Sequence, residues 1–286
     1  MNRLESAFAN KPIFMPYFPL GYPDLDTSVD VIEALAKNGA DLIEVGLSFS
    51  DPLADGPVIQ QATQIALEKG ITVKKSLAAV KELRTRGVTI PLILMGYYNP
   101  MLAYGLEKFI RDAKEAGADG FIIPDLPMEE AEEFTSVAGD MPLIQMLAPT
   151  SPDERMEAIA RNAKGFIYLV SVTGVTGERR EVSNDLGALI ARVREHTSAP
   201  VCGIWHRHAR AGEAGRSTRR WSNCRFGMRE DDRDESSACR NGEAVSGGVP
   251  KRAVRAEEID QAVSSPRRLV CISRLISSTG RFWLKR

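Results

Sequence analysis

Cysteine is scarce in this chain, and several features that would mark other classes of protein are missing. The four cysteines among 286 residues form no Cys-x-x-Cys pair, so the sequence indicates neither a disulfide framework nor a zinc site. The first residues contain no apolar core typical of a secretory signal, and no apolar run reaches the roughly 18 residues that a membrane span requires. We therefore expect a cytoplasmic protein with no membrane contact.

Charge of one sign is also lacking. The formal net charge is −1 at pH 7, and no long run of like charges occurs in the first 200 residues. A protein that binds nucleic acid or an anionic membrane surface would need a basic patch. The expected partner is therefore a small molecule and no nucleic acid.

Short apolar runs alternate with amphipathic stretches from residue 12 to about residue 200. This alternation predicts an α/β fold, and the nearly continuous apolar character of each run is typical of parallel strands covered on both faces. The predicted strands are Ile13–Leu20, Leu42–Gly46, Leu92–Gly96, Gly120–Pro124, Leu143–Leu147 and Phe166–Val170. The predicted helices are Asn2–Ala9, one that Thr27 or Ser28 caps and that runs to Lys37, Val73–Arg86, Leu102–Ala116, Glu129–Ala138, Pro152–Asn162 and Leu186–His196.

The spacing of these units favours a closed barrel over an open sheet. Six β/α units in about 200 residues match a (β/α)8 TIM barrel, which typically takes about 250 residues. An open doubly wound sheet would predict a Gly-x-Gly-x-x-Gly turn after the first strand, whereas Leu20-Gly-Tyr-Pro23 stands there. We predict a TIM barrel whose first six units occupy residues 1–202.

The composition changes abruptly after Gly203. All three tryptophans and three of the four cysteines follow this residue, arginine becomes dense, and apolar periodicity is absent until Leu269. A disordered basic tail is the ordinary interpretation of such a composition. The last two β/α units are not recognisable in residues 203–286, for which the sequence predicts no particular fold.

A shifted reading frame offers a second interpretation of this segment. Codons for Gly203–Glu213, read with a shift of one base, permit Gly-Phe-Gly-Ile-Gly-Thr-Pro-Glu-Gln-Ala, which suits a strand end, a glycine turn and a helix start. The same shift across Arg219–Gly227 permits Asp-Gly-Gly-Val-Ile-Val-Gly-Ser-Ala, which suits a buried strand and a small-residue loop. Our hypothesis is that a frameshift near codon 203 replaced the last two β/α units.

The densest group of candidate site residues runs from Glu44 to Pro57. Glu44 interrupts an apolar strand, and the carboxyl ends of barrel strands build active sites. A buried charge needs a partner or a shifted pKa, so Glu44 is either a catalytic group or a rim carboxylate in an ion pair. Asp51 and Asp55 lie in a loop stiffened by prolines, where they serve either chemistry or the capping of a turn or helix. The spacing does not match a calcium loop.

A second candidate site follows the sixth predicted strand. The residues after Phe166 run into a loop that contains Gly174 and Gly177. Backbone N–H groups exposed by such a loop could hold a phosphate, although an ordinary β/α turn would have the same two glycines. The charged residues after Gly177 form either a lid or a solvated loop.

Five motifs give residues 1–202 a resemblance to the tryptophan synthase alpha subunit family. They are Pro16-Tyr-Phe-Pro-Leu-Gly-Tyr-Pro23, Ser48-Phe-Ser-Asp-Pro-Leu-Ala-Asp-Gly-Pro57, Leu94-Met-Gly-Tyr-Tyr-Asn-Pro100, Pro124-Asp-Leu-Pro127 and Tyr168-Leu-Val-Ser-Val-Thr-Gly-Val-Thr-Gly177. The resemblance implies a lyase of tryptophan biosynthesis that cleaves indole-3-glycerol phosphate into indole and glyceraldehyde 3-phosphate. It also implies that this subunit uses no cofactor and holds no metal.

At matching positions, the resemblance implies that Glu44 is the general acid/base and Asp55 the second catalytic carboxylate. Glu44 would work best with a pKa raised towards neutrality, while Asp55 stays ionised against the indole nitrogen. The substrate-binding residues that it implies are Tyr17, Tyr97, Tyr168, Thr176 and Gly177. The three tyrosines either line the indole pocket or only pack in the barrel; the last two residues match the lid and the phosphate loop.

The resemblance further implies a protein partner, the pyridoxal-phosphate-dependent beta subunit, in an αββα heterotetramer that channels indole. The loops Asp51–Asp55 and Tyr97–Leu102 would face it. The family's remaining phosphate-binding turns occur here only in the shifted frame, and a barrel without its last two strands exposes sheet edges. We therefore predict that this exact chain folds poorly and has little or no lyase activity. The alternatives are a non-catalytic subunit that activates its beta partner and a different barrel enzyme for a phosphorylated indole or sugar.

Overall fold

The computed structural model describes residues 2–8, 13–170, 185–205 and 224–228, along which strands and helices alternate. The strands are β1 (Tyr17–Pro19), β2 (Ile43–Gly46), β3 (Leu92–Met95), β4 (Gly120–Ile122), β5 (Gln145–Leu147), β6 (Ile167–Leu169), β7 (Val201–Trp205) and β8 (Cys224–Met228). The α-helices are α1 (Arg3–Ala7), α2 (Leu25–Lys37), α3 (Pro57–Glu68), α4 (Val73–Thr85), α5 (Tyr98–Tyr104), α6 (Leu106–Ala116), α7 (Glu132–Ala138), α8 (Asp153–Asn162) and α9 (Asp185–Arg194); η1 (Met128–Glu130) is a 3-10 turn.

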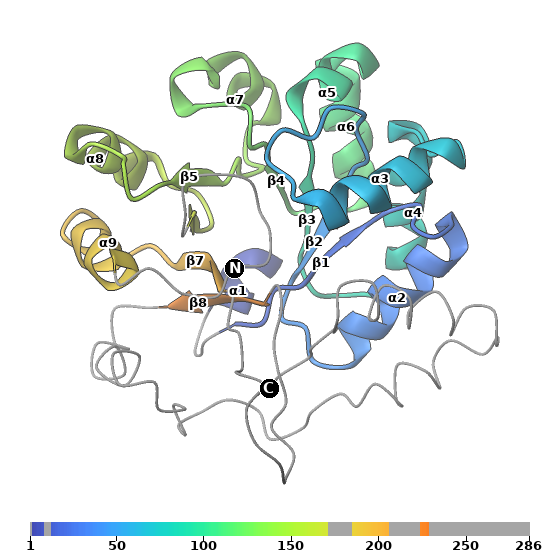
Figure 1. Ribbon diagram of the computed structural model, residues 1–286, viewed down its shortest axis with the longest axis horizontal. Helices are drawn as coiled ribbons and strands as arrows, with labels where there is room; N and C mark the ends of the chain where they lie inside the picture. Colours follow the sequence, from blue (N-terminus) through green and yellow to red (C-terminus); the bar gives the residue numbers. More distant parts are fainter. Residues whose placement is uncertain (1, 9–12, 171–184, 206–223, 229–286) are drawn as a thin grey trace, which may run out of the picture.

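The strands pair in chain order around a common axis. β1 to β4 form one parallel sheet, and β5 to β7 form a second, with a single parallel bridge between Phe121 and Leu143 joining the two. Figure 1 shows the strands curving around the centre while the helices that connect them lie outside. This arrangement confirms the predicted α/β barrel architecture for the first six units, although each of their strands is one to five residues shorter than predicted.

The last described strand departs from the parallel order of a barrel. β7 continues the sheet in parallel with β6 and runs through residue 203. β8 pairs antiparallel with β7, with Val201 opposite Met228 and Trp205 opposite Cys224. All strands of a (β/α)8 barrel run parallel, so β8 cannot be its eighth strand. Within the described ranges, the series of parallel strands ends at β7.

The strands are buried on both faces, as their sequences predict. Because successive side chains point to opposite faces, Leu42 and Glu44 face the inside of the barrel while Ile43 and Val45 face the surrounding helices. The interior cluster consists of Leu4, Phe8, Ile13, Met15, Leu42, Ile93, Ile122, Ile144, Phe166, Tyr168 and Cys202. Glu44 is therefore a buried carboxylate in a barrel interior that is mostly apolar.

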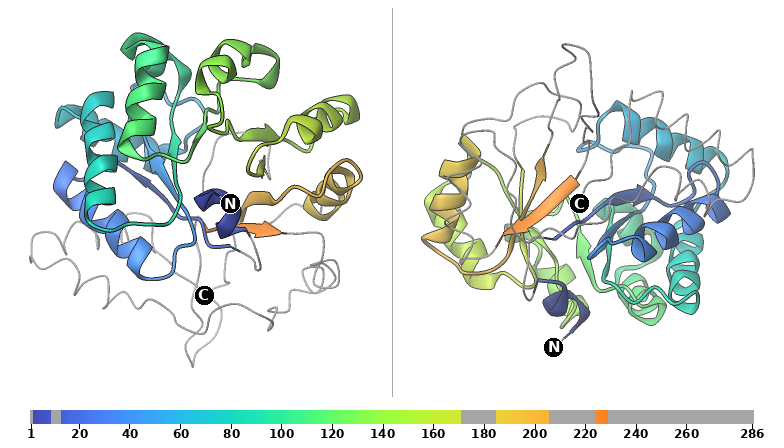
Figure 2. Two further views of the ribbon diagram at one scale, coloured as in Figure 1. Left: turned by 180° about the vertical axis from the view of Figure 1, so that it is seen from behind. Right: turned by 90° about the horizontal axis from the view of Figure 1, so that it is seen from below.

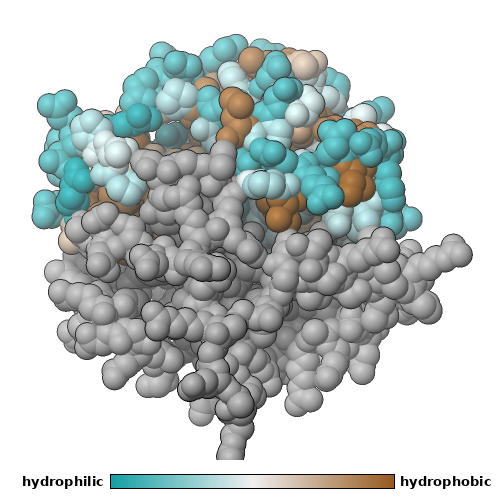
Figure 3. Space-filling view, in the orientation of Figure 1, coloured by the Kyte–Doolittle hydropathy of each residue, from teal (hydrophilic) through white to brown (hydrophobic). Residues whose placement is uncertain are grey.

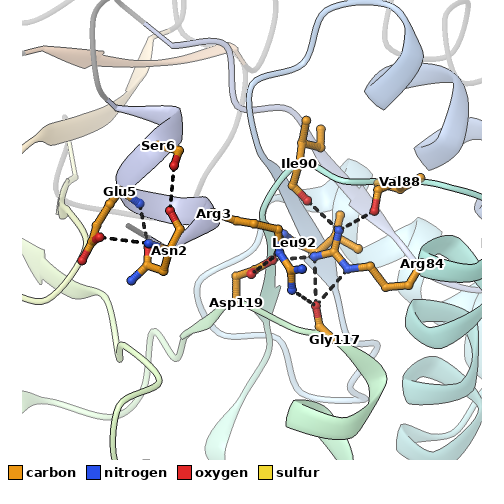
Figure 4. Close-up of polar contacts among 10 residues, drawn as sticks. All are labelled: Asn2, Arg3, Glu5, Ser6, Arg84, Val88, Ile90, Leu92, Gly117 and Asp119. Atoms are coloured by element: carbon orange, nitrogen blue, oxygen red, sulfur yellow. Dashed lines mark hydrogen bonds and ion pairs between the residues drawn. The ribbon is translucent and has the colours of Figure 1, made fainter.

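Helix α1 covers one end of the barrel. Its Leu4 and the following Phe8 are buried in the interior cluster, and Figure 2 shows α1 across the middle of the ring of strands in the view from behind. Arg3 Nε contacts Asp119 Oδ1 at 2.8 Å, immediately before β4 begins. In the close-up of Figure 4, Asn2 and Glu5 form a capping box at the start of the helix. α1 therefore closes the amino-terminal end of the strands.

A largely buried ion pair fixes the starts of β3 and β4 at this same end (Figure 4). The guanidinium of Arg84 donates to the carbonyl oxygens of Gly117, Val88 and Ile90 and pairs with Asp119 at 2.5 Å. The oxygen of Asp119 that pairs with Arg84, Oδ2, also accepts the N–H of Leu92, the first residue of β3, at 2.8 Å. In barrels the amino-terminal end serves stability, and the carboxyl end is left for chemistry.

The predicted cap of α2 was wrong. Asp24, rather than Thr27 or Ser28, is the N-cap, because its carboxylate accepts the N–H of Thr27 at 2.8 Å. Ser28 instead secures the preceding turn, since its Oγ accepts the N–H of Gly21 at 3.0 Å. An aspartate three residues before Thr27 is the stronger capping signal, and it moves the start of the helix to Leu25.

Three other helical segments differ from the sequence-based expectation. The stretch predicted as one helix over residues 102–116 is two helices, because Gly105 adopts a φ of +92° between them. The stretch over residues 129–138 begins as the 3-10 turn η1. α3 was not predicted, because its buried residues, Ala62, Thr63 and Ala66, are small or polar and give only a weak apolar stripe.

Candidate active site

Three polar side chains occupy the apolar interior of the barrel. Glu44 on β2 is completely buried, Tyr168 on β6 is nearly so, and Tyr17 on β1 is partly buried. Tyr17 is the register partner of Glu44 in the β1–β2 pair, so the two side chains share the inner face. The structure therefore brings the predicted residues Glu44, Tyr17 and Tyr168 into one interior.

Tyr17 lies close against the backbone of Gly46. A Cβ atom added at residue 46 would overlap the hydroxyl and ring carbons of Tyr17. Gly46 ends β2, two residues after Glu44, and its missing side chain leaves room for the phenol ring at the carboxyl end of the strand. The glycine in the motif Glu44-Val-Gly46 thus has a steric role that complements the carboxylate.

Asp55 lies in the loop between β2 and α3, and only 6% of its surface is exposed. Its N–H donates to the carbonyl oxygen of Pro52 at 3.1 Å, and its own carbonyl oxygen accepts the side-chain amide of Gln60 at 2.9 Å. α3 begins two residues later with Pro57 as its first residue. The backbone of Asp55 is thus fixed on both sides.

Tyr97 holds the side chain of Asp55. It follows β3, the neighbour of β2, and its hydroxyl donates to Asp55 Oδ2 at 3.0 Å. The same hydroxyl accepts the N–H of Ala54 at 3.0 Å, and the ring of Tyr97 packs against that of Phe49 with centroids 5.5 Å apart. Two of the predicted site residues, Asp55 and Tyr97, are therefore in direct contact.

Burial controls the protonation of this group. It raises the pKa of Asp55 from 3.8 to about 6, while the hydrogen bond from Tyr97 acts in the opposite direction. Burial, followed by the charge of Asp55, raises the pKa of Tyr97. Burial, with smaller contributions from Cys202 and Asp55, raises the pKa of Tyr168 well above its ordinary value. Both phenols stay neutral donors, while Asp55 titrates in the range where a carboxylate can exchange protons near neutral pH.

The face beside Asp55 carries exposed apolar side chains. The exposed large apolar residues in the described ranges are Leu53, Val58 and Leu102, with exposed fractions of 78%, 41% and 43%. Figure 3 shows apolar surface interspersed with hydrophilic surface over the part of the molecule that it colours. Leu53 is next to Ala54, and Leu102 belongs to α5, which follows Tyr97. The exposed apolar groups thus flank the two loops that carry Asp55 and Tyr97.

Two predicted site residues, Thr176 and Gly177, lie outside the described residues, as does the loop that contains them. Within the described ranges, no group of three His, Cys, Asp or Glu side chains could hold a metal ion. No helix of the described part is long and apolar enough to span a bilayer.

The contact between Asp55 and Tyr97 was not anticipated from the sequence. The two residues are 42 positions apart, and the sequence gives each a role of its own without linking them. A signal was present, because both residues follow strands that are neighbours in a parallel barrel, and the loops after such strands meet at one end. That reasoning could have placed them together without fixing the hydrogen bond.

The fold and the site define the class of this protein. Parallel strands surround an interior that contains Glu44, and Asp55 is buried in the loop that follows the same strand. In barrel enzymes the groups that react lie at this carboxyl end. The chain is therefore built as a (β/α)-barrel protein with one buried carboxylate in its interior and a second in the loop after the same strand.

Comparison with known proteins gives the family. The family model of the tryptophan synthase alpha chain matches residues 4–206. The tryptophan synthase alpha chains of Roseiflexus sp. (strain RS-1) and Chloroflexus aurantiacus are 50% and 47% identical over 208 residues, covering 70% of this chain and 80% and 78% of theirs. The chain belongs to the tryptophan synthase alpha chain family.

Solved structures agree with this assignment. The structure of tryptophan synthase from Mycobacterium tuberculosis matches with a TM-score of 0.63 at 38% identity, and tryptophan synthase subunit alpha from Legionella pneumophila with 0.64 at 36%. Each match covers 70% of this chain and 77% of the other. These matches confirm the TIM barrel as the fold class, and the family match ends near the predicted boundary after residue 202.

Proposed function

We propose that the barrel of this chain is built to cleave indole-3-glycerol phosphate into indole and glyceraldehyde 3-phosphate, with Glu44 and Asp55 as its catalytic carboxylates. The observation that carries the proposal is the pair of carboxylates on one strand and its following loop, one fully buried in the barrel and the other held by Tyr97. Membership of the tryptophan synthase alpha chain family supports a lyase of tryptophan synthesis.

The reaction needs two proton transfers that balance each other. A proton is added to indole C3, which places positive charge on the ring nitrogen, and the hydroxyl of the carbon attached to C3 loses a proton as the carbon–carbon bond breaks. That carbon becomes the aldehyde, and the electrons of the broken bond return to the indole ring. Glu44 donates the first proton and accepts the second, while ionised Asp55 stabilises the ring N–H. Each positioned acid or base typically contributes about 10²–10⁴-fold to the rate.

The remaining predicted residues would position the substrate. Tyr17 and Tyr168 share the interior with Glu44, and Tyr97 contacts Asp55. We assign the indole ring to the region between the two carboxylates, where these phenol rings would line it. Thr176 and Gly177 are proposed to hold the phosphate and to close over the site, as backbone N–H groups in such loops do in other proteins.

The proposed partner is the beta subunit, in an αββα assembly. Leu53, in the loop before α3, and Leu102, on α5, support this proposal because large apolar side chains that are exposed to water are typical of a protein interface. In this proposal the pyridoxal phosphate belongs to the partner, this subunit needs no cofactor, and the complex works in the cytoplasm.

A second candidate is a catalytically impaired subunit. Two observations favour it: β8 is antiparallel to β7, and the family match stops at residue 206. We propose that residues 203–286 are the product of a shifted reading frame, and that the chain lacks the last two β/α units and their half of the phosphate site. A chain of this kind would keep both carboxylates and yet bind its substrate weakly.

Release of indole from indole-3-glycerol phosphate tests both proposals. Two chains would be compared, this exact chain and a version whose codons from 203 onwards are read with a shift of one base. We expect cleavage by the second chain and little or none by the first. Equal activity of the two chains would refute the proposed impairment. If the second chain folds but does not cleave the substrate, the proposed lyase function is refuted.

A further inference from the structure

The hydroxyl of Tyr97 makes two hydrogen bonds, and their geometry fixes the direction of its proton. It accepts the N–H of Ala54 at 3.0 Å and contacts Asp55 Oδ2 at 3.0 Å. A phenol has one hydrogen to donate, and an ionised carboxylate can only accept. When Asp55 is ionised, the phenol hydrogen must therefore point at Oδ2. The oxygen of the hydroxyl accepts the backbone N–H of Ala54 at the same time.

The ring of Tyr97 is held in place. Only 4% of its surface is exposed, and it packs against Phe49 with ring centroids 5.5 Å apart. Tyr97 directly precedes α5, whose Tyr98 donates its N–H to Asp125 at 3.0 Å. The donor that faces Asp55 is thus fixed by packing and by the start of a helix. Because the side chain is already ordered, forming the hydrogen bond costs little further conformational entropy.

The carboxylate has one oxygen engaged within the protein. Among the residues that the structure describes, Tyr97 is the side chain that donates to Asp55, and it does so through Oδ2. The indole N–H of the proposed substrate would need an acceptor, and Oδ1 is the oxygen of this carboxylate to which Tyr97 does not donate. The contact therefore leaves one oxygen for an external donor.

We propose that Tyr97 is a positioning residue for Asp55, whose hydroxyl keeps the carboxylate in its ionised form and fixes Oδ2 so that Oδ1 meets the substrate. The proposal rests on the function proposed above in one respect, the identity of the substrate. The contact itself concerns only Tyr97, Ala54 and Asp55, and it can be measured without turnover.

The electrostatic consequence has a definite sign. Burial favours the neutral form of Asp55, and the Tyr97 hydrogen bond favours the ionised form, so removal of the hydroxyl should raise the pKa of Asp55 above about 6. The other titratable groups around this pair are Tyr168 on β6, whose charge interacts with Asp55, Glu44 in the barrel interior, and Asp125 after β4, whose charge interacts with Tyr97. Tyr97→Phe leaves all of these in place.

The test is a carbon NMR titration of the aspartate carboxyl groups in the full chain, with Asp55→Asn to assign the signal. Loss of a hydrogen bond to a charged group should raise the midpoint by about one pH unit or more in Tyr97→Phe. At pH 6 the ionised fraction of Asp55 would then fall roughly fivefold. An unchanged midpoint in a folded Tyr97→Phe protein overturns the proposal.

Tyr104→Phe is the matched control. The hydroxyl of Tyr104 donates to Asp112 Oδ2 at 2.7 Å, so this variant removes the same kind of bond at the far end of α5. The Asp112 midpoint should rise and the Asp55 midpoint should stay where it is. A rise at Asp55 in this variant would show a general effect of losing a phenol, which would also overturn the proposal.

A second measurement covers the case in which Tyr97→Phe does not fold. In the unaltered chain, the NMR signal of labelled Tyr97 Cζ should shift with the same midpoint as that of Asp55. The reason is that the hydroxyl donates to a charged carboxylate above this midpoint and faces a neutral carboxyl group below it. No inflection at that midpoint would refute the contact. If the version read in the shifted frame from codon 203 folds and fails to release indole while the inflection is intact, the proposed function is refuted and the contact stands.

Discussion

Replacement of Asp55 by asparagine should stabilise the fold while removing activity. Burial raises the pKa of Asp55 from 3.8 to about 6, so the folded state favours the protonated carboxyl more than the unfolded chain does. The stability associated with this group is therefore fully present below pH 3.8 and is lost as the pH rises through about 6. Since a tenfold change in proton affinity corresponds to about 1.4 kcal/mol, ionised Asp55 costs the folded state about 3 kcal/mol at neutral pH.

The assay is urea unfolding of the unaltered chain and of Asp55→Asn between pH 4 and pH 7.5. Asparagine does not titrate and can still accept the hydrogen bond from Tyr97, so the free energy of unfolding of the variant should gain about 2–3 kcal/mol on the unaltered chain across this range. Asp51→Asn is the matched control, because Asp51 lies exposed in the same loop and its carboxylate stays in water. A difference between Asp55→Asn and the unaltered chain that is flat with pH would refute the reasoning.

Three further predictions concern other parts of the molecule. In a chain that cleaves indole-3-glycerol phosphate, the rate should rise with pH through about 6 as Asp55 ionises, and a rate independent of pH there would contradict its role. Arg84→Met should lower the free energy of unfolding by about 3–5 kcal/mol because it removes the largely buried ion-pair partner of Asp119 and the guanidinium that donates to three carbonyl groups, whereas Arg3→Met, at a side chain 47% exposed, should cost less than about 1 kcal/mol in the same urea experiment. Leu53→Asp should weaken binding to a beta subunit about tenfold or more by calorimetry without changing stability, and Leu102→Asp should do the same; unchanged affinity in both would rule out this face as the interface.

The sequence was sufficient to predict the strands and their burial. Nearly continuous apolar runs predicted parallel strands, which the structure confirms. The sequence allowed Glu44, the single acidic residue in one of them, to be either a catalytic group or a rim carboxylate, and the structure buries it completely on β2. The catalytic role of that carboxylate remains a prediction. The same reasoning missed α3, because a helix that buries alanines and a threonine lacks the apolar periodicity on which helix prediction depends.

The arrangement of the site depended on contacts that sequence patterns do not encode. Asp55 and Tyr97 meet only because two loops after neighbouring strands converge. The hydrogen bond between them limits how far burial raises the pKa of Asp55. The end of the barrel is a different case. The change of composition after residue 203 predicts that the barrel pattern ends there, and within the described ranges the strand that follows β7 is antiparallel to it. That a shifted reading frame is the cause stays a prediction.

The account depends most on Glu44 as the group that moves protons in the barrel interior. The most direct test is indole release from indole-3-glycerol phosphate by the version read in the shifted frame from codon 203, carrying either Glu44→Gln or, as a matched control, Glu115→Gln on the exposed face of α6. We predict that Glu44→Gln lowers the rate at least about a hundredfold with the fold intact, and that Glu115→Gln leaves it unchanged. A Glu44→Gln variant that still releases indole at the unaltered rate would contradict the account.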